Sequence, residues 1–225
     1  INIKMLPGAR DIPGFNKWHN EMRNDDKTVM VSHGGNGVSF LQEQVDYDYR
    51  QYDSVGMMNL NIIAGKRKGA DMDKPVFPAG SAELWFHHGL LQPDGSHADD
   101  PNFPGLQMEI LYEVYWKQTP KGEFYDAYKL VKSFRDGLQK ALWVNKGNPN
   151  RDKLAAALTA MSKDPTAIAN LIKKNGKYDW YIGKAGDAQR DKLLTFVSEK
   201  TLKNLVKFNK EALGLKSIYK EELTK

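Results

Sequence analysis

The chain has 225 residues, of which 40% are hydrophobic and 27% are charged, a balance typical of a folded globular protein rather than a disordered one. It contains no cysteine, which excludes disulfide scaffolds, thiolate metal sites and thiol nucleophiles. No stretch approaches the roughly 20 uncharged apolar residues of a membrane-spanning helix. The net charge of +5 is spread among interspersed acidic residues, so no nucleic-acid partner is expected.

The first part of the chain alternates strand-like and helix-like segments. Residues 1–6 and 28–33 have the composition of strands, and each is followed by a glycine-containing loop. Apolar residues at helical spacing follow in 14–24, and 38–44 resembles the start of another helix. Residues 54–63 supply a further apolar strand. This alternation predicts an α/β fold with a mostly parallel sheet flanked by helices.

The middle of the chain differs in composition from both ends. Residues 66–103 are rich in prolines and polar residues, with strand character only at 82–87, which indicates a linker or a reduced second lobe. From residue 106 the pattern is mainly helical, with a strand at 140–145. We expect this strand to join those at 1–6 and 28–33, so that residues 1–65 and 104–225 form the main lobe, with helices near 14–24, 150–162 and 186–212.

Two glycine-containing loops, 7–14 and 32–37, follow predicted strands and precede predicted helices. At the carboxyl ends of parallel strands, their unpaired amides would suit an anion. Neither loop has the spacing of a dinucleotide or P-loop motif, and turns without a ligand remain the alternative. Arg10 could hold a carboxylate with its planar guanidinium, or pair on the surface near Asp11. The candidate ligand-binding residues are Gly8, Ala9, Arg10, Ser32, His33, Gly34, Gly35, Asn36 and Gly37.

Other polar and aromatic clusters have simpler interpretations. His87 and His88 could form a metal site with His97, Asp99 and Asp100, but adjacent residues of a strand point to opposite faces. The histidine spacings also lack a zinc motif, so no metal or other cofactor is expected.

Aromatic residues are expected mainly to support packing. The alternating tyrosines and aspartates of 46–53 predict a surface loop whose tyrosines lean on the next strand. Trp116, Trp143 and Trp180 are expected in the core.

Several short motifs occur in a fixed order along the chain. Pro7-Gly8-Ala9 ends the first predicted strand, residues 25–29 lead into the second, and the loop 32–37 follows it. Residues 49–56 carry a tyrosine–aspartate segment that enters the next strand. The later matches are at 100–104, 141–144, 148–151 and 160–165. In this order the motifs resemble the receptors of the tripartite tricarboxylate transporters, the Bug family of extracytoplasmic solute-binding proteins, over residues 1–65 and 99–213.

The resemblance implies a periplasmic-binding-protein-like lobe and a function without catalysis. Such receptors have two α/β lobes and hold a small organic acid between them. By resemblance, this chain would be a periplasmic monomer that captures a di- or tricarboxylate and delivers it to membrane transporter subunits.

This chain departs from the family pattern in several places. A first strand and loop, and most of the second lobe, would be missing, with a break in the chain expected between Lys66 and Asp100. Arg10-Asp11 also replaces a Gly-Gly pair. The alternatives are a metal-dependent enzyme that uses His33, His87 and His88, and a single-lobe interaction or structural module that has lost transport.

Overall fold

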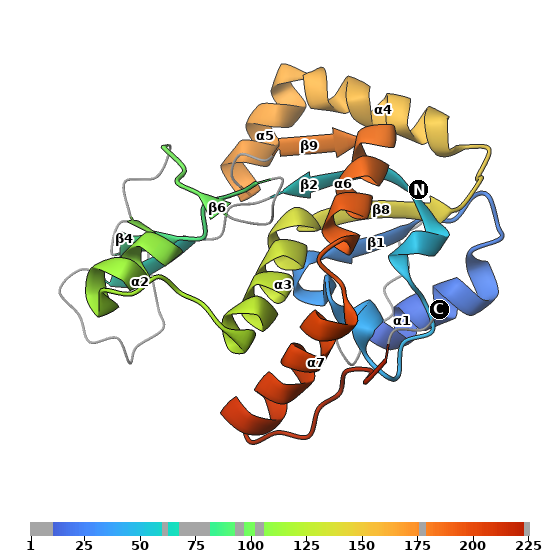
Figure 1. Ribbon diagram of the computed structural model, residues 1–225. Helices are drawn as coiled ribbons and strands as arrows, with labels where there is room; N and C mark the ends of the chain where they lie inside the picture. Colours follow the sequence, from blue (N-terminus) through green and yellow to red (C-terminus); the bar gives the residue numbers. More distant parts are fainter. Residues whose placement is uncertain are drawn as a thin grey trace.

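The centre of the fold is a four-stranded sheet in the order β1-β8-β2-β9. The computed structural model describes residues 11–59, 63–67, 82–92, 97–101, 106–175 and 179–222, and the predicted strand at 1–6 lies outside them. Figure 1 shows α3 and α6 crossing in front of this sheet, with α4 beside its β9 edge. The strands of the sheet are β1 (Met30–His33), β2 (Tyr52–Asn59), β8 (Lys140–Asn145) and β9 (Asp179–Ile182).

The prediction of a mostly parallel sheet is wrong, because every pair of neighbouring strands in the central sheet is antiparallel. The predicted strands near 28–33 and 140–145 do lie side by side, but His33 at the end of β1 pairs with Lys140 at the start of β8. Helix α3 (Glu123–Gly137) explains this direction, since its last turn packs against the loop that follows β1. A strand that begins beside the end of its neighbour must run back along it. The mixture of helices and strands agrees with the predicted α/β composition, whereas a periplasmic-binding-protein-like lobe with a parallel sheet is contradicted.

The helices form close to the predicted positions. The predicted helix at 14–24 is α1 followed by a π-helical turn at Trp18–Met22, and the predicted segment 186–212 contains two helices. Ser198 separates them because its hydroxyl accepts the amide of Thr201 and starts the second helix. The predicted helix at 38–44 is only a short turn at Ser39–Leu41. The helices other than α3 are α1 (Ile12–Lys17), α2 (Met108–Trp116), α4 (Arg151–Lys163), α5 (Pro165–Asn175), α6 (Lys184–Leu194) and α7 (Glu199–Lys207). None of the described helices is long and apolar enough to cross a membrane.

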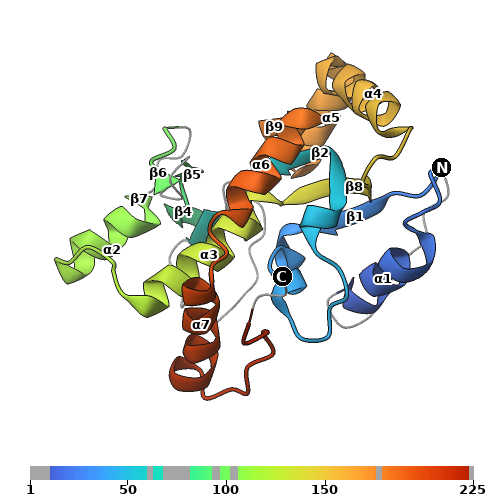
Figure 2. The same ribbon diagram turned by 45° about the vertical axis from the view of Figure 1, so that its right-hand side comes forward.

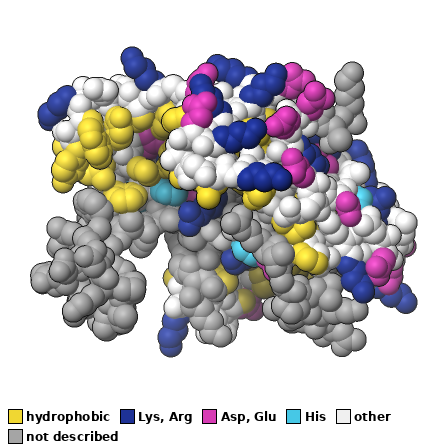
Figure 3. Space-filling view, turned by 90° about the horizontal axis from the view of Figure 1, so that it is seen from below, with side chains coloured by type: hydrophobic (Ala, Val, Ile, Leu, Met, Phe, Trp, Pro, Cys, Tyr) yellow, Lys and Arg dark blue, Asp and Glu magenta, His cyan; other side chains and the backbone are white. Residues whose placement is uncertain are grey.

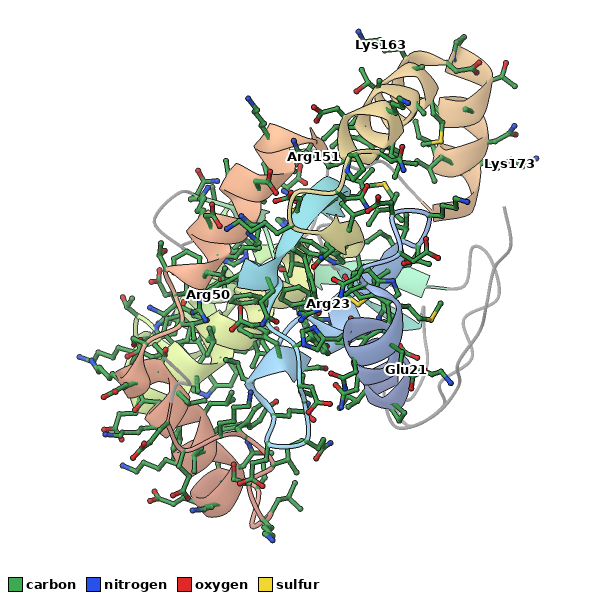
Figure 4. The ribbon with its side chains drawn as sticks, turned by 90° about the vertical axis from the view of Figure 1, so that its right-hand side faces the viewer. Glu21, Arg23, Arg50, Arg151, Lys163 and Lys173 are labelled. Atoms are coloured by element: carbon green, nitrogen blue, oxygen red, sulfur yellow. The ribbon has the colours of Figure 1, made fainter. Side chains whose placement is uncertain are left out.

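Arg151 links two helices to the central strand. It lies at the start of α4, where Figure 4 labels it beside the sheet. Its Nε donates to the carbonyl oxygen of Ser54 in β2 at 3.0 Å, and its guanidinium pairs with Asp187 of α6. Asp187 in turn accepts the Ser54 amide at 2.8 Å. This network satisfies β2 backbone groups beside a bulge at 54–56 in its pairing with β8, where the regular ladder is interrupted.

The core is dominated by aromatic side chains. Trp143 of β8 is fully buried and stacks on Tyr49 with ring centroids 4.9 Å apart. Tyr47 and Tyr52 are also buried. The prediction that 46–53 is a surface loop is therefore wrong for the tyrosines of this segment, which belong to the core. The prediction for Trp116 is wrong as well, since this side chain is 60% exposed. Trp143 is confirmed as a core residue.

Two small sheets lie at one end of the molecule. The first has the order β3-β4-β7, in which β4 and β7 form the only parallel pair among the described strands, and the second pairs β5 with β6. Figures 1 and 2 both place these strands and α2 at the end opposite α1. The prediction of a linker or reduced lobe at 66–103 stays a prediction, and the expected chain break falls partly on residues outside the described ranges. The strands are β3 (Ile63–Arg67), β4 (Ala82–His87), β5 (Leu90–Leu91), β6 (His97–Ala98) and β7 (Leu106–Gln107).

Candidate functional site

The loop 33–37 is a tight turn that follows β1 in the chain and packs against the last turn of α3. The amide of Gly35 donates to Nδ1 of His33 at 3.0 Å, and the amide of His33 donates to Oδ1 of Asn36 at 3.0 Å. The amide of Gly34 donates to the carbonyl oxygen of Gln139, just before β8. The amides of His33, Gly34 and Gly35 are therefore already hydrogen-bonded to other groups of the protein. The main donors that the loop offers to a ligand are side chains rather than a row of free amides.

At two positions of this loop, glycine is required because the backbone of α3 leaves no room for a side chain. A Cβ on Gly34 would overlap the carbonyl oxygen of Arg135, and one on Gly37 would lie 2.8 Å from the carbonyl oxygen of Phe134. Both obstacles are backbone atoms, which a rotamer change cannot move. The third glycine, Gly35, is exposed, and a Cβ there would lie 2.7 Å from Cε1 of His33. Any side chain at Gly35 would therefore displace the His33 ring.

The loop holds a carboxylate that belongs to the chain itself. Oδ2 of Asp11 accepts a hydrogen bond from Nε2 of His33 at 2.9 Å and one from Nδ2 of Asn36 at 3.3 Å. Because Nδ1 of His33 is the acceptor for Gly35, the neutral ring with its proton on Nε2 satisfies both bonds. The His33 and Asp11 side chains are 49% and 41% exposed, whereas Asn36 is fully buried, so the carboxylate of Asp11 lies at the surface between an exposed donor and a buried one.

Asp11 has an unusual backbone conformation for this role. Its φ is 66°, in the left-handed region that favours glycine, and it precedes α1 without capping that helix through its side chain. The carboxylate reaches the loop instead. In the linear sequence Asp11 is notable only as a neighbour of Arg10, and no sequence pattern connects position 11 with positions 33 and 36.

The other predicted ligand-binding residues are placed as follows. Gly8, Ala9 and Arg10 lie outside the described residues, so their role stays a prediction. Ser32 is 1% exposed, and its hydroxyl accepts the indole Nε1–H of Trp143 at 2.8 Å. Ser32 therefore secures β1 to β8 within the core and does not line the surface of the loop.

A second polar cluster is buried on α3, near the small sheets. Nδ1 of His88 lies 3.1 Å from Oδ2 of Asp136, and Nε2 of His97 lies 3.5 Å from the same oxygen. One turn earlier on the helix, Nζ of Lys132 donates to Oε1 of Glu109 at 2.8 Å. The Lys132 side chain is fully buried and that of Asp136 is 4% exposed. These groups join three segments that are distant in sequence.

The histidines of this region divide between two carboxylates, with His88 and His97 at Asp136 and His87 at Asp99. His87 lies 3.1 Å from Oδ1 of Asp99, whereas its neighbour His88 contacts Asp136. No group of three potential ligands that could hold a metal ion occurs in the described part of the chain. His33 contacts Asp11, so the three histidines of the enzyme alternative have three different carboxylate partners.

Burial shifts the titration of the second cluster. It disfavours the charged forms of His97 and Lys132, and the pKa of each lies below its usual value. Burial alone would raise the pKa of Asp136, but hydrogen bonds from His88 and His97 outweigh it and lower that pKa. For Glu109 the hydrogen bond and charge of Lys132 likewise outweigh burial, and its pKa is lowered.

These shifts predict a loss of stability in mild acid. The pKa of His97 is below its unfolded value of 6.5, so the unfolded chain binds a proton first and the free energy of unfolding falls as pH drops below about 6.5. Asp136 adds a loss of the same sign at more acidic pH. Urea unfolding at pH 7.5 and pH 5.5 should show the decrease, and His97→Gln should reduce it.

His19 needs its own control. Its pKa is also lowered, first by burial and then by Arg23, so it contributes with the same sign. His19→Asn keeps a polar partner near the hydroxyl of Tyr52, 2.7 Å from Nδ1, and should remove only its own share of the pH dependence. Equal stability of the parent protein at both pH values would contradict buried neutral histidines.

Comparisons with protein-family models, with curated proteins and with solved structures find no match to this chain.

Proposed function

We propose that this protein captures a small organic acid, a di- or tricarboxylate, and that one ligand carboxylate binds the donors of the loop 33–37. The observation that carries the proposal is the internal carboxylate of Asp11, which accepts from His33 and Asn36. Donors that hold one carboxylate can hold another of the same shape, and hydrogen bonds to a charged acceptor are the stronger kind.

The binding step would be an exchange of carboxylates. The ligand replaces Asp11 as the acceptor of Nε2 of His33 and Nδ2 of Asn36, while the contact of Gly34 and Gly37 with α3 keeps the loop in place. Because the donors are held by the fold before the ligand arrives, little conformational entropy is lost on binding. The protein then releases the acid unchanged, so its activity is saturable binding and not turnover.

The ordered motifs support a receptor role for this binding. Their resemblance to tripartite transporter receptors favours a periplasmic protein with membrane transporter subunits as partners. The proposal does not depend on a parallel sheet, which the described part of the chain lacks at its centre. The metal-dependent alternative is not proposed, because His33, His87 and His88 contact different carboxylates.

Removing the internal carboxylate should strengthen ligand binding. Asp11→Gly suits the backbone, because glycine adopts a φ of 66° readily. Citrate, succinate, malate and glutarate should each be tested by thermal shift and by calorimetry. We expect at least one of them to bind Asp11→Gly about tenfold more tightly than the parent protein, equivalent to about 1.4 kcal/mol.

Gly35→Leu provides the matched negative control. The new side chain would displace the His33 ring, since even a Cβ comes within 2.7 Å of it, and binding should be lost while the variant still unfolds cooperatively. If neither the parent protein nor Asp11→Gly shows a saturable shift with any of the four acids, organic-acid capture at this loop is wrong.

A further inference from the structure

A pocket lies between α3 and the turn 195–198, which joins α6 to α7. Figures 1 and 2 both show α7 beside α3. The volume of the pocket is about 260 Å³, just below the range of roughly 300–1,000 Å³ that is usual for drug-sized ligands. No residue of the loop 33–37 lines it. The residues that α3 contributes are three or four positions apart and therefore share one face of that helix: Asp126, Lys129, Leu130 and Ser133.

Hydroxyl groups line this pocket, and one of them has no partner. The hydroxyls of Ser198 and Thr201 lie 3.1 Å apart at the start of α7, and that of Thr195 donates to a carbonyl oxygen near the end of α6. Ser133 is only 1% exposed, and its hydroxyl makes no hydrogen bond within the described part of the chain. A buried hydroxyl without a partner costs free energy, so its place in the pocket wall indicates a bound acceptor.

The charged groups of the pocket favour an anion. Nζ of Lys129 lies 3.3 Å from Oδ1 of Asp126, so these two charges largely cancel. Lys200 also lines the pocket and is exposed, and it belongs to no ion pair among the residues that the structure describes. The first amides of α7 have no partner within the helix and point back toward the same turn, where the helix dipole adds positive potential. One positive charge is therefore left for a ligand.

The surface around the pocket is not broadly basic. Figure 3 looks onto the end of the molecule at which Figure 1 places α7, and it shows basic side chains intermingled with acidic ones there. General attraction of anions to such a surface is weak and is screened by salt. Selective binding of an anion therefore has to come from the pocket itself.

We propose that this pocket binds the phosphate group of a small phosphorylated molecule. The ammonium of Lys200 and the hydroxyl of Ser133 are separate donors on two helices, and the residues lining the pocket include no arginine. Separate donors suit a tetrahedral phosphate, whose oxygens point in different directions, whereas a planar carboxylate is matched best by a guanidinium. The side chains of Leu130 and Phe196 offer an apolar surface for the organic part of the ligand.

Calorimetry with the full chain tests the chemical class of the ligand. Inorganic phosphate and glycerol 3-phosphate should both bind saturably, and glycerate, which carries a carboxylate in place of the phosphate, should bind at least about tenfold more weakly than glycerol 3-phosphate. The glycerate titration uses Gly35→Leu, so that the proposed carboxylate site at the loop 33–37 does not contribute. If neither phosphate compound binds, or if glycerate binds as tightly, the proposal is wrong.

Ser133→Ala separates binding from stability. Loss of the hydroxyl should weaken binding of glycerol 3-phosphate about tenfold, because a hydrogen bond to a charged acceptor is lost. The free energy of unfolding should stay the same or rise, because the hydroxyl has no partner in the free protein and alanine favours the helix. Binding equal to that of the parent protein would exclude the pocket as the site.

A matched pair of lysines distinguishes the pocket from general attraction. Lys200→Gln should weaken binding about fivefold, whereas Lys203→Gln should weaken it by less than about twofold. Lys203 is exposed on the same helix but does not line the pocket. Equal losses in the two variants would overturn the proposal in favour of a nonspecific charge effect. Gly35→Leu should bind glycerol 3-phosphate as the parent protein does, and loss of binding in that variant would place the phosphate at the loop 33–37 instead.

Discussion

Glu109→Gln is expected to lower the free energy of unfolding by about 3–5 kcal/mol, the usual cost of removing one partner from a buried ion pair. The Lys132 side chain is fully buried, and its ammonium lies 2.8 and 3.1 Å from the two carboxylate oxygens of Glu109. Without that carboxylate the charge stays in a site from which water is excluded. Burial already lowers the pKa of Lys132, so the lysine has little tolerance for losing its partner. Guanidinium unfolding at pH 7.5 measures the loss.

Two further variants distinguish a buried charge from a general defect. The double variant Glu109→Gln/Lys132→Met should recover most of the lost stability, because methionine leaves no charge to compensate. Lys129→Met, on the same helix, removes a half-exposed pair with Asp126 and should change the free energy of unfolding by no more than about 0.5 kcal/mol. If Glu109→Gln and Lys129→Met cost the same, Lys132 is not a buried ion.

Trp143→Ala is expected to cost about 3–5 kcal/mol, as for other fully buried aromatic residues replaced by alanine. The indole is completely inaccessible to solvent and stacks on Tyr49. It lies on β8, the strand that pairs with both β1 and β2. A cavity at this point loosens the central sheet, and chemical denaturation should show a lower midpoint.

A second tryptophan and a conservative replacement serve as controls. Trp116→Ala should lie within about 0.5 kcal/mol of the parent protein, as exposed positions usually do, because that side chain is 60% exposed. Trp143→Phe keeps an aromatic ring but removes the donor to the buried hydroxyl of Ser32, which should cost about 1–3 kcal/mol. A large loss in Trp116→Ala would show that α2 is packed within the monomer.

The positions of several elements could be predicted because they depend on local patterns. The helical spacing of apolar residues at 14–24 and the short apolar runs of β4 and β8 identify these elements without knowledge of the rest of the chain. The glycines of the loop 33–37 also marked a turn. The reason that glycine is needed there lies in the tertiary structure, however, because the carbonyl oxygens of α3 leave no room for a side chain at Gly34 and Gly37.

Hydrophobicity alone misassigned two aromatic segments. An alternating run of tyrosine and aspartate can be a surface loop or a core segment with its carboxylates at the edge, and only the position of Trp143 and Phe40 against Tyr49 decides that it is core. Trp116 has the opposite outcome. Its helix has the composition of a buried helix, but it is held by the polar contacts of Glu109 and Gln107 and projects from the surface.

Composition and periodicity are properties of neighbouring residues, and they were enough to identify a folded α/β protein without cysteine chemistry and to locate many of its helices and strands. Strand direction and the carboxylate site depend instead on contacts between distant parts of the chain. Alternation along a strand is the same in either direction, so the antiparallel pairing of β1 with β8 follows from where α3 ends. The contact between Asp11 and His33 joins residues 22 positions apart, and it exists because the fold brings the start of α1 to the end of β1.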